Sequence, residues 1–246
     1  MPLAIPTSYL NLGKPHFFGD AVPAEFSARF TPVICRVPAA HVGLLCGTVF
    51  AVLTTLMADG QPQSSLVWCD YDGADLVVYE SHWGNTAEIA RAIAAGLGPD
   101  AQALTTDAAT GEALAGVDLI VAGAPLLGFA LPTQSMLDNI AAGADKDPVP
   151  PDLAHPSMRA WLAALPPGHG RAAAFETRIW WSPGSAARAI LRRLAELGYP
   201  ALGDVERFVV KGKYGPLADG EGARARVWGM GLAQAMRELR QAELHG

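Results

Sequence analysis

Leu76-Val77-Val78-Tyr79-Glu80-Ser81-His82-Trp83-Gly84-Asn85-Thr86-Ala87-Glu88-Ile89-Ala90-Arg91-Ala92 is the stretch that decides the fold. Its first four residues form a short apolar run, which is typical of a buried parallel strand. A polar turn containing Gly84 follows. After the turn, apolar residues recur at helical spacing and predict one buried helix face: Ala87, Ile89, Ala90, Ile93 and Leu97.

A strand that ends in a hydroxyl residue, a glycine and a helix N-terminus can form a pocket for an anion. Free backbone N–H groups and the positive end of the helix converge there, and hydroxyl groups add uncharged donors. The residue types at 81–86 therefore indicate a phosphate site. The alternative is an ordinary capped helix with no ligand, because Ser/Gly/Thr turns are common before helices.

Strands and helices alternate from residue 75 onward. The predicted strands are 76–80, 101–105, 117–123, 171–175 and 205–210. The predicted helices are 86–97, 109–114, 133–142, 157–165, 182–197 and a last one ending near 241. This alternation predicts an α/β fold, a doubly wound five-stranded parallel sheet with helices on both faces. Ligands bind such sheets at the carboxyl ends of the strands, at a switch point in strand order.

The turn Ser81-x-Trp83-Gly84-Asn85-Thr86 resembles the phosphate-binding loop of the flavodoxin-like family. This chain has Trp83 at the position where the family's loop has a hydroxyl residue. The segment from Phe175 to Ala187 and Gly215–Glu221 are similar to a group of flavodoxin-domain proteins, so the resemblance covers about residues 75–240. It implies a sheet of order 2-1-3-4-5 and FMN as cofactor. The phosphate would be bound by Ser81, His82, Trp83, Gly84, Asn85 and Thr86.

Two further strand ends would flank the flavin ring. The resemblance assigns this part to the apolar loop Pro125, Leu126, Leu127, Gly128 and Phe129, and to Thr177 and Arg178 after the fourth strand. Each has a simpler interpretation. The apolar loop could be a buried linker, and Arg178 could pair with Glu176. Trp180 and Trp181 are candidates to stack on the ring, and they could equally cover a core edge or form an interface.

Bulk composition narrows the function classes. The chain has 246 residues, half of them hydrophobic, and a net charge of −6 from 18 basic and 24 acidic residues. This balance gives no basic footprint for nucleic acid. Cys35, Cys46 and Cys69 lack metal-ligand spacing, which indicates no metal site and fits a reducing cytoplasm. The uncharged run 42–58 contains glycines and threonines, and its second half is typical of a strand, so no membrane span is expected.

The predicted organisation is an N-terminal extension, residues 1–74, followed by a flavodoxin-like domain, residues 75–246. Asp59-Gly60 between two β-rich runs, 49–57 and 61–71, predicts a hairpin in the extension. Residues 48–78 resemble the opening strands of the pyridoxamine 5'-phosphate oxidase-like split barrel, truncated before the barrel can close. The hairpin could extend the sheet, pack on the second domain, or mediate homodimerisation.

No hydrolytic or nucleotide-binding motif is present, so no catalytic side chain is assigned, and a cofactor would supply any chemistry. The leading hypothesis is an FMN-binding protein that transfers electrons to a redox partner protein or a small-molecule acceptor. Two alternatives stay open. One is an NAD(P)H-dependent quinone or nitro reductase of the same fold, and the other is an FMN-free interaction module.

Overall fold

The computed structural model describes residues 49–56, 60–69, 75–111, 113–114 and 116–245. The chain divides into two compact units, one of residues 1–72 with 240–246 and one of residues 73–239. The N-terminal lead-in, with Cys35 and Cys46, lies outside the described residues. Among the residues that are described, no helix combines the length and the apolar character needed to cross a membrane.

The predicted hairpin is confirmed. Strands β1, Val49–Leu56, and β2, Pro62–Cys69, pair antiparallel, with Val49 opposite Cys69 and Leu56 opposite Pro62. Gly60 in the connection has a φ of +81°, a conformation that glycine adopts without the steric penalty of a Cβ. Asp59 of the predicted turn lies outside the described residues. The second half of the uncharged run 42–58 is thus a strand, as its β-branched composition predicts.

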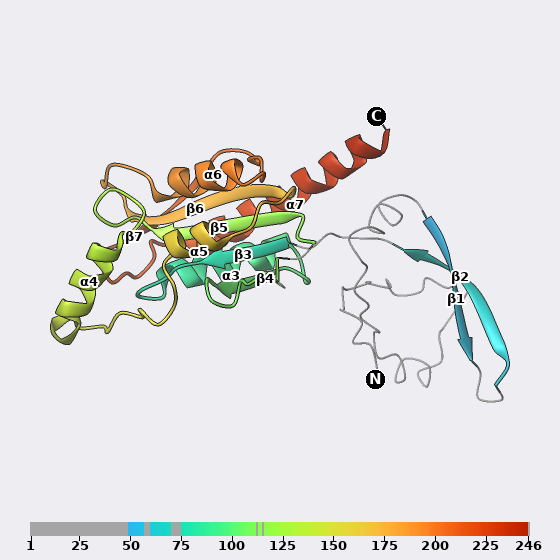
Figure 1. Ribbon diagram of the computed structural model, residues 1–246, viewed down its shortest axis with the longest axis horizontal. Coiled ribbons are helices and arrows are strands. Elements are labelled where there is room, and N and C mark those ends of the chain that lie inside the picture. The colour runs from blue at the N-terminus through green and yellow to red at the C-terminus, as the bar shows by residue number, and fades with distance from the viewer. Residues whose placement is uncertain (1–48, 57–59, 70–74, 112, 115, 246) are drawn as a thin grey trace. The chain divides into compact units, whose positions relative to one another are not determined.

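The second unit is built on a parallel sheet of five strands (Figure 1). They are β3 Asp75–Tyr79, β4 Gln102–Thr105, β5 Leu119–Pro125, β6 Arg171–Ile179 and β7 Glu206–Val210. Their order across the sheet is β4-β3-β5-β6-β7. Numbered along the chain within this sheet, the order is 2-1-3-4-5, as predicted. The switch point lies at β3, because the chain goes to one side of β3 for β4 and to the other side for β5.

Helices cover both faces of this sheet. They are α3 Asn85–Leu97, α4 Gln134–Gly143, the 3₁₀ turn η1 Ala144–Lys146, α5 Met158–Ala164, α6 Ala186–Glu196 and α7 Glu221–His245. Figure 1 shows α6 on one side of the sheet and α3 on the other.

Alternation along the strands sorts side chains between two cores. Leu76, Val78 and Ile120 face α5 and α6, whereas Val77 and Val121 face α3 and α7. The central strands are therefore apolar on both sides, which explains why they appear in the sequence as continuous hydrophobic runs.

Several predicted elements differ in type or extent. Strand β5 begins and ends two residues later than the predicted 117–123, and α7 continues to His245, beyond its predicted end near 241. The described residues of 109–114 form turns instead of a helix, with Leu114 N donating to Thr110 O. This segment is short and contains Gly111, and both features disfavour a helix. Strand β6 runs to Ile179, beyond the predicted end at 175, because Thr177 and its neighbours pair with β5 and β7.

Helix α6 begins at Ala186, four residues after the predicted start at Ser182. Ser185 is its N-cap, and its Oγ accepts a hydrogen bond from Arg188 N at 3.2 Å. Gly184, just before the cap, has a φ of +87°, which is incompatible with a helix. Pro183 therefore precedes the helix. The C-terminal end of α6 lies where the sequence predicted it, because Gly198 follows the helix with a φ of +91°.

Candidate functional site

The loop between β3 and α3 places a helix N-terminus at the switch point of the sheet. Gly84 is the N-cap residue of α3, with a φ of +85°, and no side chain caps this helix end. By contrast, α4, α5 and α6 are capped by the side chains of Thr133, Ser157 and Ser185. The first N–H groups of a helix have no intrahelical acceptor. The N-terminus of α3 therefore offers backbone donors that the loop itself does not satisfy.

Two side-chain donors in the same loop, the Ser81 hydroxyl and the Trp83 indole N–H, are buried without a partner in the described part of the chain, whereas His82 Nε2, also without a hydrogen bond, faces Glu80 Oε1 at 3.4 Å. Among the described residues, neither Ser81 Oγ nor Trp83 Nε1 has a hydrogen-bond partner, and both atoms are excluded from solvent. A buried donor left unsatisfied costs about 1–3 kcal/mol, so such atoms are rare unless a ligand completes them. An indole N–H is a hydrogen-bond donor. Trp83 thus supplies a hydrogen-bond donor at the position where the phosphate-binding loop of the flavodoxin-like family has a hydroxyl residue.

These features fit a phosphate group. Phosphate oxygens accept hydrogen bonds, and this loop presents backbone N–H groups, a hydroxyl and an indole N–H as donors. Gly84 also leaves open space, because a Cβ built on it would meet no atom within 4 Å.

Thr86 joins the loop to the fourth strand of the sheet. Its Oγ1 lies 2.8 Å from Oγ1 of Thr177, and both residues are almost fully buried. Thr177 is in β6, two strands away from β3. The sequence placed both threonines near the cofactor, and the structure brings their hydroxyls together. One hydroxyl of the pair donates to the other, which leaves a single O–H free for another acceptor.

His82 is held by the protein itself. Its Nδ1 lies 3.3 Å from the Asp152 carbonyl oxygen, and its Nε2 lies 3.4 Å from Glu80 Oε1. Asp152 N also donates to the His82 carbonyl at 2.7 Å, so the segment before α5 packs on the loop. Glu80 Oε2 accepts from Met158 N at 2.9 Å. The imidazole is 5% exposed and therefore acts here as a structural element of the loop.

The segment after β7 covers the loop, and sequence reasoning missed this contact. Asn85 Nδ2 donates to the Tyr214 carbonyl at 3.1 Å, and the rings of Trp83 and Tyr214 meet edge to face at 5.5 Å. Gly215 has a φ of +96°, and a Cβ on it would lie 2.3 Å from Asn85 Oδ1. Only glycine permits this approach. The Gly-Pro-Leu pattern at 215–217 was the available signal.

Asp147 anchors that covering segment. Its Oδ1 accepts hydrogen bonds from Tyr214 Oη at 2.7 Å and from Lys213 Nζ at 3.1 Å. The hydrogen bond from Tyr214, with help from Lys213, holds the pKa of Asp147 below its ordinary value. Lys213 also lies over the ring of Trp83, with Nζ 5.3 Å from the ring centroid. The cover is therefore fixed by charged and aromatic contacts together.

The apolar loop after β5 forms a tight turn at the same edge. Leu127 and Ala130 exchange both backbone hydrogen bonds, and Leu126 N donates to the Thr177 carbonyl at 2.9 Å. Gly128 and Phe129 have φ angles of +50° and +72°. A left-handed conformation at a phenylalanine is uncommon and marks a constrained backbone. Pro125 ends β5, and Leu126 is buried, whereas Phe129 is 57% exposed.

The turn after β6 touches this loop. A Cβ on Gly184 would lie 1.9 Å from the Phe129 carbonyl oxygen, so the two backbones are in close contact. Trp180 and Trp181 are 76% and 60% exposed. With Phe129, they form a set of exposed aromatic side chains on two loops that follow adjacent strands.

Arg178 pairs with Glu176, which is the simpler of the two roles that the sequence suggested for it. Its Nη1 donates to Glu176 Oε1 at 2.9 Å and to the Gly184 carbonyl at 3.2 Å. Glu176 is fully buried in β6, and its Oε2 also accepts from Ser185 Oγ and Ala187 N. Sequence reasoning placed Glu176 in a turn and gave it no structural role beyond pairing. The carboxylate instead ties β6 to the start of α6.

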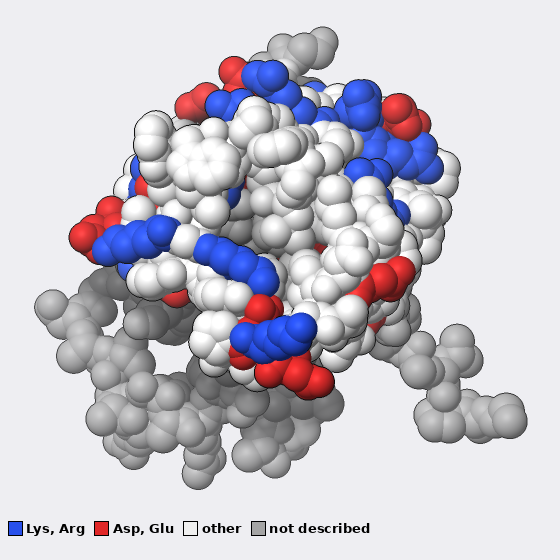
Figure 2. Space-filling model, turned by 90° about the vertical axis from the view of Figure 1, so that its left-hand side faces the viewer, with Lys and Arg blue, Asp and Glu red and all other residues white. Residues whose placement is uncertain are grey.

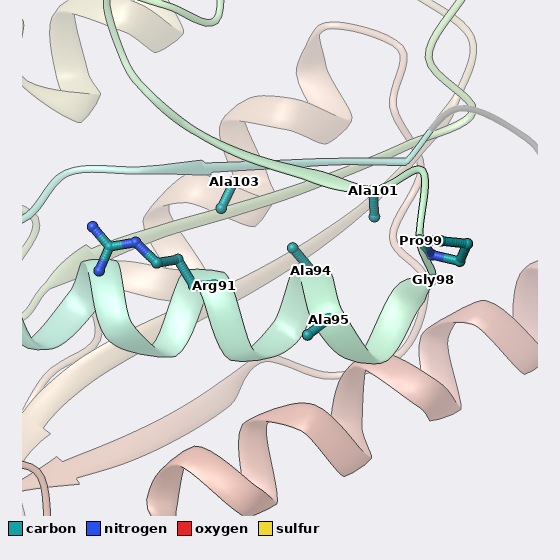
Figure 3. Close-up of a pocket in the computed structure, with 7 residues that line it drawn as sticks. All are labelled: Arg91, Ala94, Ala95, Gly98, Pro99, Ala101 and Ala103. Atoms are coloured by element: carbon teal, nitrogen blue, oxygen red, sulfur yellow. The ribbon is translucent and has the colours of Figure 1, made fainter. Parts of the chain in front are cut away.

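Figure 2 looks onto the end of the molecule that lies at the left of Figure 1. The surface there is hollowed and mostly uncharged at its centre, with Lys, Arg, Asp and Glu side chains around it. A separate depression lies between α3 and the start of β4 (Figure 3). Small residues and Arg91 line it, including Ala94, Gly98 and Ala103. It offers few polar groups and is not a candidate for the phosphate.

No family model and no curated protein matches the chain. A flavodoxin from the domain Archaea is 21% identical, with 67% of this chain and 99% of that chain covered and a TM-score of 0.47. Flavodoxin 1 from Bacillus cereus is 18% identical, with 65% and 97% covered and a TM-score of 0.47. A flavodiiron core from Synechocystis is 20% identical, with 68% of this chain but 37% of that chain covered and a TM-score of 0.44.

The assignment of the fold depends on the strand order and the layers described above. Five parallel strands in the order 2-1-3-4-5, with helices on both faces, define the flavodoxin-like arrangement. The second unit of this chain has the flavodoxin-like fold.

Proposed function

We propose that the protein binds FMN and acts in electron transfer. The observation that carries the proposal is the loop 81–84, where the uncapped N-terminus of α3 adjoins the buried, unpartnered Ser81 Oγ. This loop follows the strand at the switch point, which is where doubly wound proteins bind their ligands. FMN would supply the redox chemistry, and the protein would bind and orient it.

The phosphate would be bound by Ser81, Trp83 and the backbone N–H groups that follow Gly84, with the Thr86–Thr177 pair beside them. His82 would hold the loop in shape, since both of its ring nitrogens already face protein oxygens. Asn85 would contribute its backbone N–H, because its side chain donates to Tyr214.

The flavin ring would lie against the loop Pro125–Phe129 and the residues that follow Thr177 and Arg178. Phe129, Trp180 and Trp181 support this placement, because large aromatic side chains are seldom this exposed without a partner surface. Aromatic rings are also suited to stack on a flat heterocycle.

The electron acceptor would be a redox partner protein or a small molecule, and the protein would act in the cytoplasm. The β1–β2 hairpin would mediate homodimerisation. Turnover of NAD(P)H with a quinone would identify a reductase. Bound FMN without such turnover would identify a carrier.

The proposal is tested by purifying the untagged full-length protein, recording its absorbance spectrum, and titrating FMN while following quenching of flavin fluorescence. We expect a flavin spectrum or saturable quenching at one FMN per chain. A colourless protein that does not quench FMN would overturn the proposal and favour an FMN-free interaction module.

A further inference from the structure

A polar groove lies beside α6, away from the loop 81–84. It has a volume of about 470 Å³ and runs between α6 and the strands β6 and β7. Four arginines line it, together with three small residues: Arg178, Arg188, Arg192 and Arg207, with Gly184, Ser185 and Ala189. Lys and Arg side chains gather in the upper part of Figure 2, the side on which α6 lies in Figure 1.

The arginines of this groove are only partly neutralised. Glu176 is the carboxylate that pairs with them, at 2.9 Å from Arg178 Nη1 and 3.6 Å from Arg207 Nε. Arg188 and Arg192 lie one helical turn apart on the exposed side of α6. Among the described residues, no carboxylate forms an ion pair with either. The lining therefore carries a surplus of roughly three positive charges when the four guanidinium groups are ionised.

This surplus is unusual for the chain as a whole, which has a net charge of −6. It also does not depend on the N-terminus of α6. Ala187 N already donates to Glu176 Oε2, and Arg188 N donates to Ser185 Oγ. The attraction for an anion comes from the guanidinium groups themselves.

We propose that this groove binds an anion with two linked phosphate groups, the diphosphate of a nucleotide or free pyrophosphate. Two linked phosphates carry roughly three negative charges near neutral pH, which matches the surplus of the lining. Guanidinium groups bind phosphate oxygens through two parallel hydrogen bonds, and arginine is favoured over lysine at such sites. The volume is within the range of small-molecule sites.

The site is independent of the FMN phosphate, because the groove and the loop 81–84 lie on different strands. Arg178 and Gly184 nevertheless belong to the turn that would flank the flavin ring. A diphosphate bound in the groove would therefore lie next to that turn. This is the position expected for a phosphorylated molecule that reacts with the bound flavin.

Isothermal titration calorimetry on the full-length protein tests the proposal with three probes: ADP, inorganic pyrophosphate and inorganic phosphate. The double variant Arg188→Ala/Arg192→Ala removes the two unpaired guanidinium groups from an exposed helix face. Arg193→Ala is the matched control, because Arg193 is on the same helix and pairs with Glu196 at 3.0 Å. Thermal unfolding of each variant checks that the fold is retained.

We expect saturable binding of ADP or pyrophosphate to the wild type, weaker binding of phosphate, and a Kd at least about tenfold higher in the double variant. The control should bind like the wild type. ADP bound more tightly than pyrophosphate would identify a nucleotide site, and the reverse order would identify a pyrophosphate site. If neither ADP nor pyrophosphate binds the wild type, or if Arg193→Ala loses as much affinity as the double variant, the proposal is overturned. FMN titration of the double variant separates the two sites, since its FMN affinity should not change.

Discussion

Replacing Ser81 by alanine separates binding from folding, because Ser81 Oγ is buried but has no partner within the described protein. The substitution removes no hydrogen bond from the folded apo-protein. Deleting a buried, unsatisfied hydroxyl is therefore expected to leave the free energy of unfolding unchanged or slightly higher. If the hydroxyl donates to the FMN phosphate, its loss removes a hydrogen bond to a charged group, worth about 1.5–3 kcal/mol. That energy corresponds to a Kd about ten- to a hundredfold higher.

The assay is a pair of measurements on the same preparation: quenching of FMN fluorescence for affinity, and urea unfolding of the apo-protein for stability. Thr86→Ala is the matched comparison, because its Oγ1 does have a partner, Thr177 Oγ1 at 2.8 Å. This variant should lose about 1–3 kcal/mol of stability, since it leaves a buried hydroxyl unsatisfied. An FMN affinity that Ser81→Ala leaves unchanged would refute the assignment of this loop to the phosphate.

Two further predictions concern the surrounding loops. Gly184→Ala should destabilise the fold by roughly 1–3 kcal/mol more than Gly203→Ala. Both glycines have a positive φ, but only a Cβ at position 184 would clash with the Phe129 carbonyl oxygen. Equal urea midpoints of the two variants would contradict that contact. Asp147→Asn should lower the thermal unfolding temperature near neutral pH only. The hydrogen bond from Tyr214 lowers the pKa of Asp147 from its ordinary 3.8. Its contribution is therefore complete above 3.8 and disappears as pH falls through the lowered value, where variant and wild type should converge.

The sequence predicted the sheet well because its central strands are buried on both faces. Leu76–Val78 and Leu119–Ala122 are uninterrupted apolar runs, and such runs are hard to place anywhere except in the middle of a parallel sheet. The alternation with helices then left few possible strand orders. The loop 81–86 was found for the same reason, since it follows the clearest strand and precedes the clearest helix.

What the sequence could not predict depends on contacts between distant segments. Glu176 was placed in a turn because a glutamate rarely continues a buried strand. It does so here because three hydrogen-bond donors, from β6 and the start of α6, surround its carboxylate. The guanidinium group of Arg207 in β7 adds an ion pair at 3.6 Å. The cover that Tyr214 forms over Trp83 joins residues 131 positions apart, and no local pattern reports such a contact.

The most direct test of the central claim is a side-by-side titration of the apo-protein with FMN and riboflavin, which share the flavin ring but differ by the phosphate. If the loop 81–84 binds the phosphate, FMN should bind at least about tenfold more tightly, since at least one charge-assisted hydrogen bond is absent with riboflavin. Equal affinities for the two flavins, or binding of neither, would contradict the account.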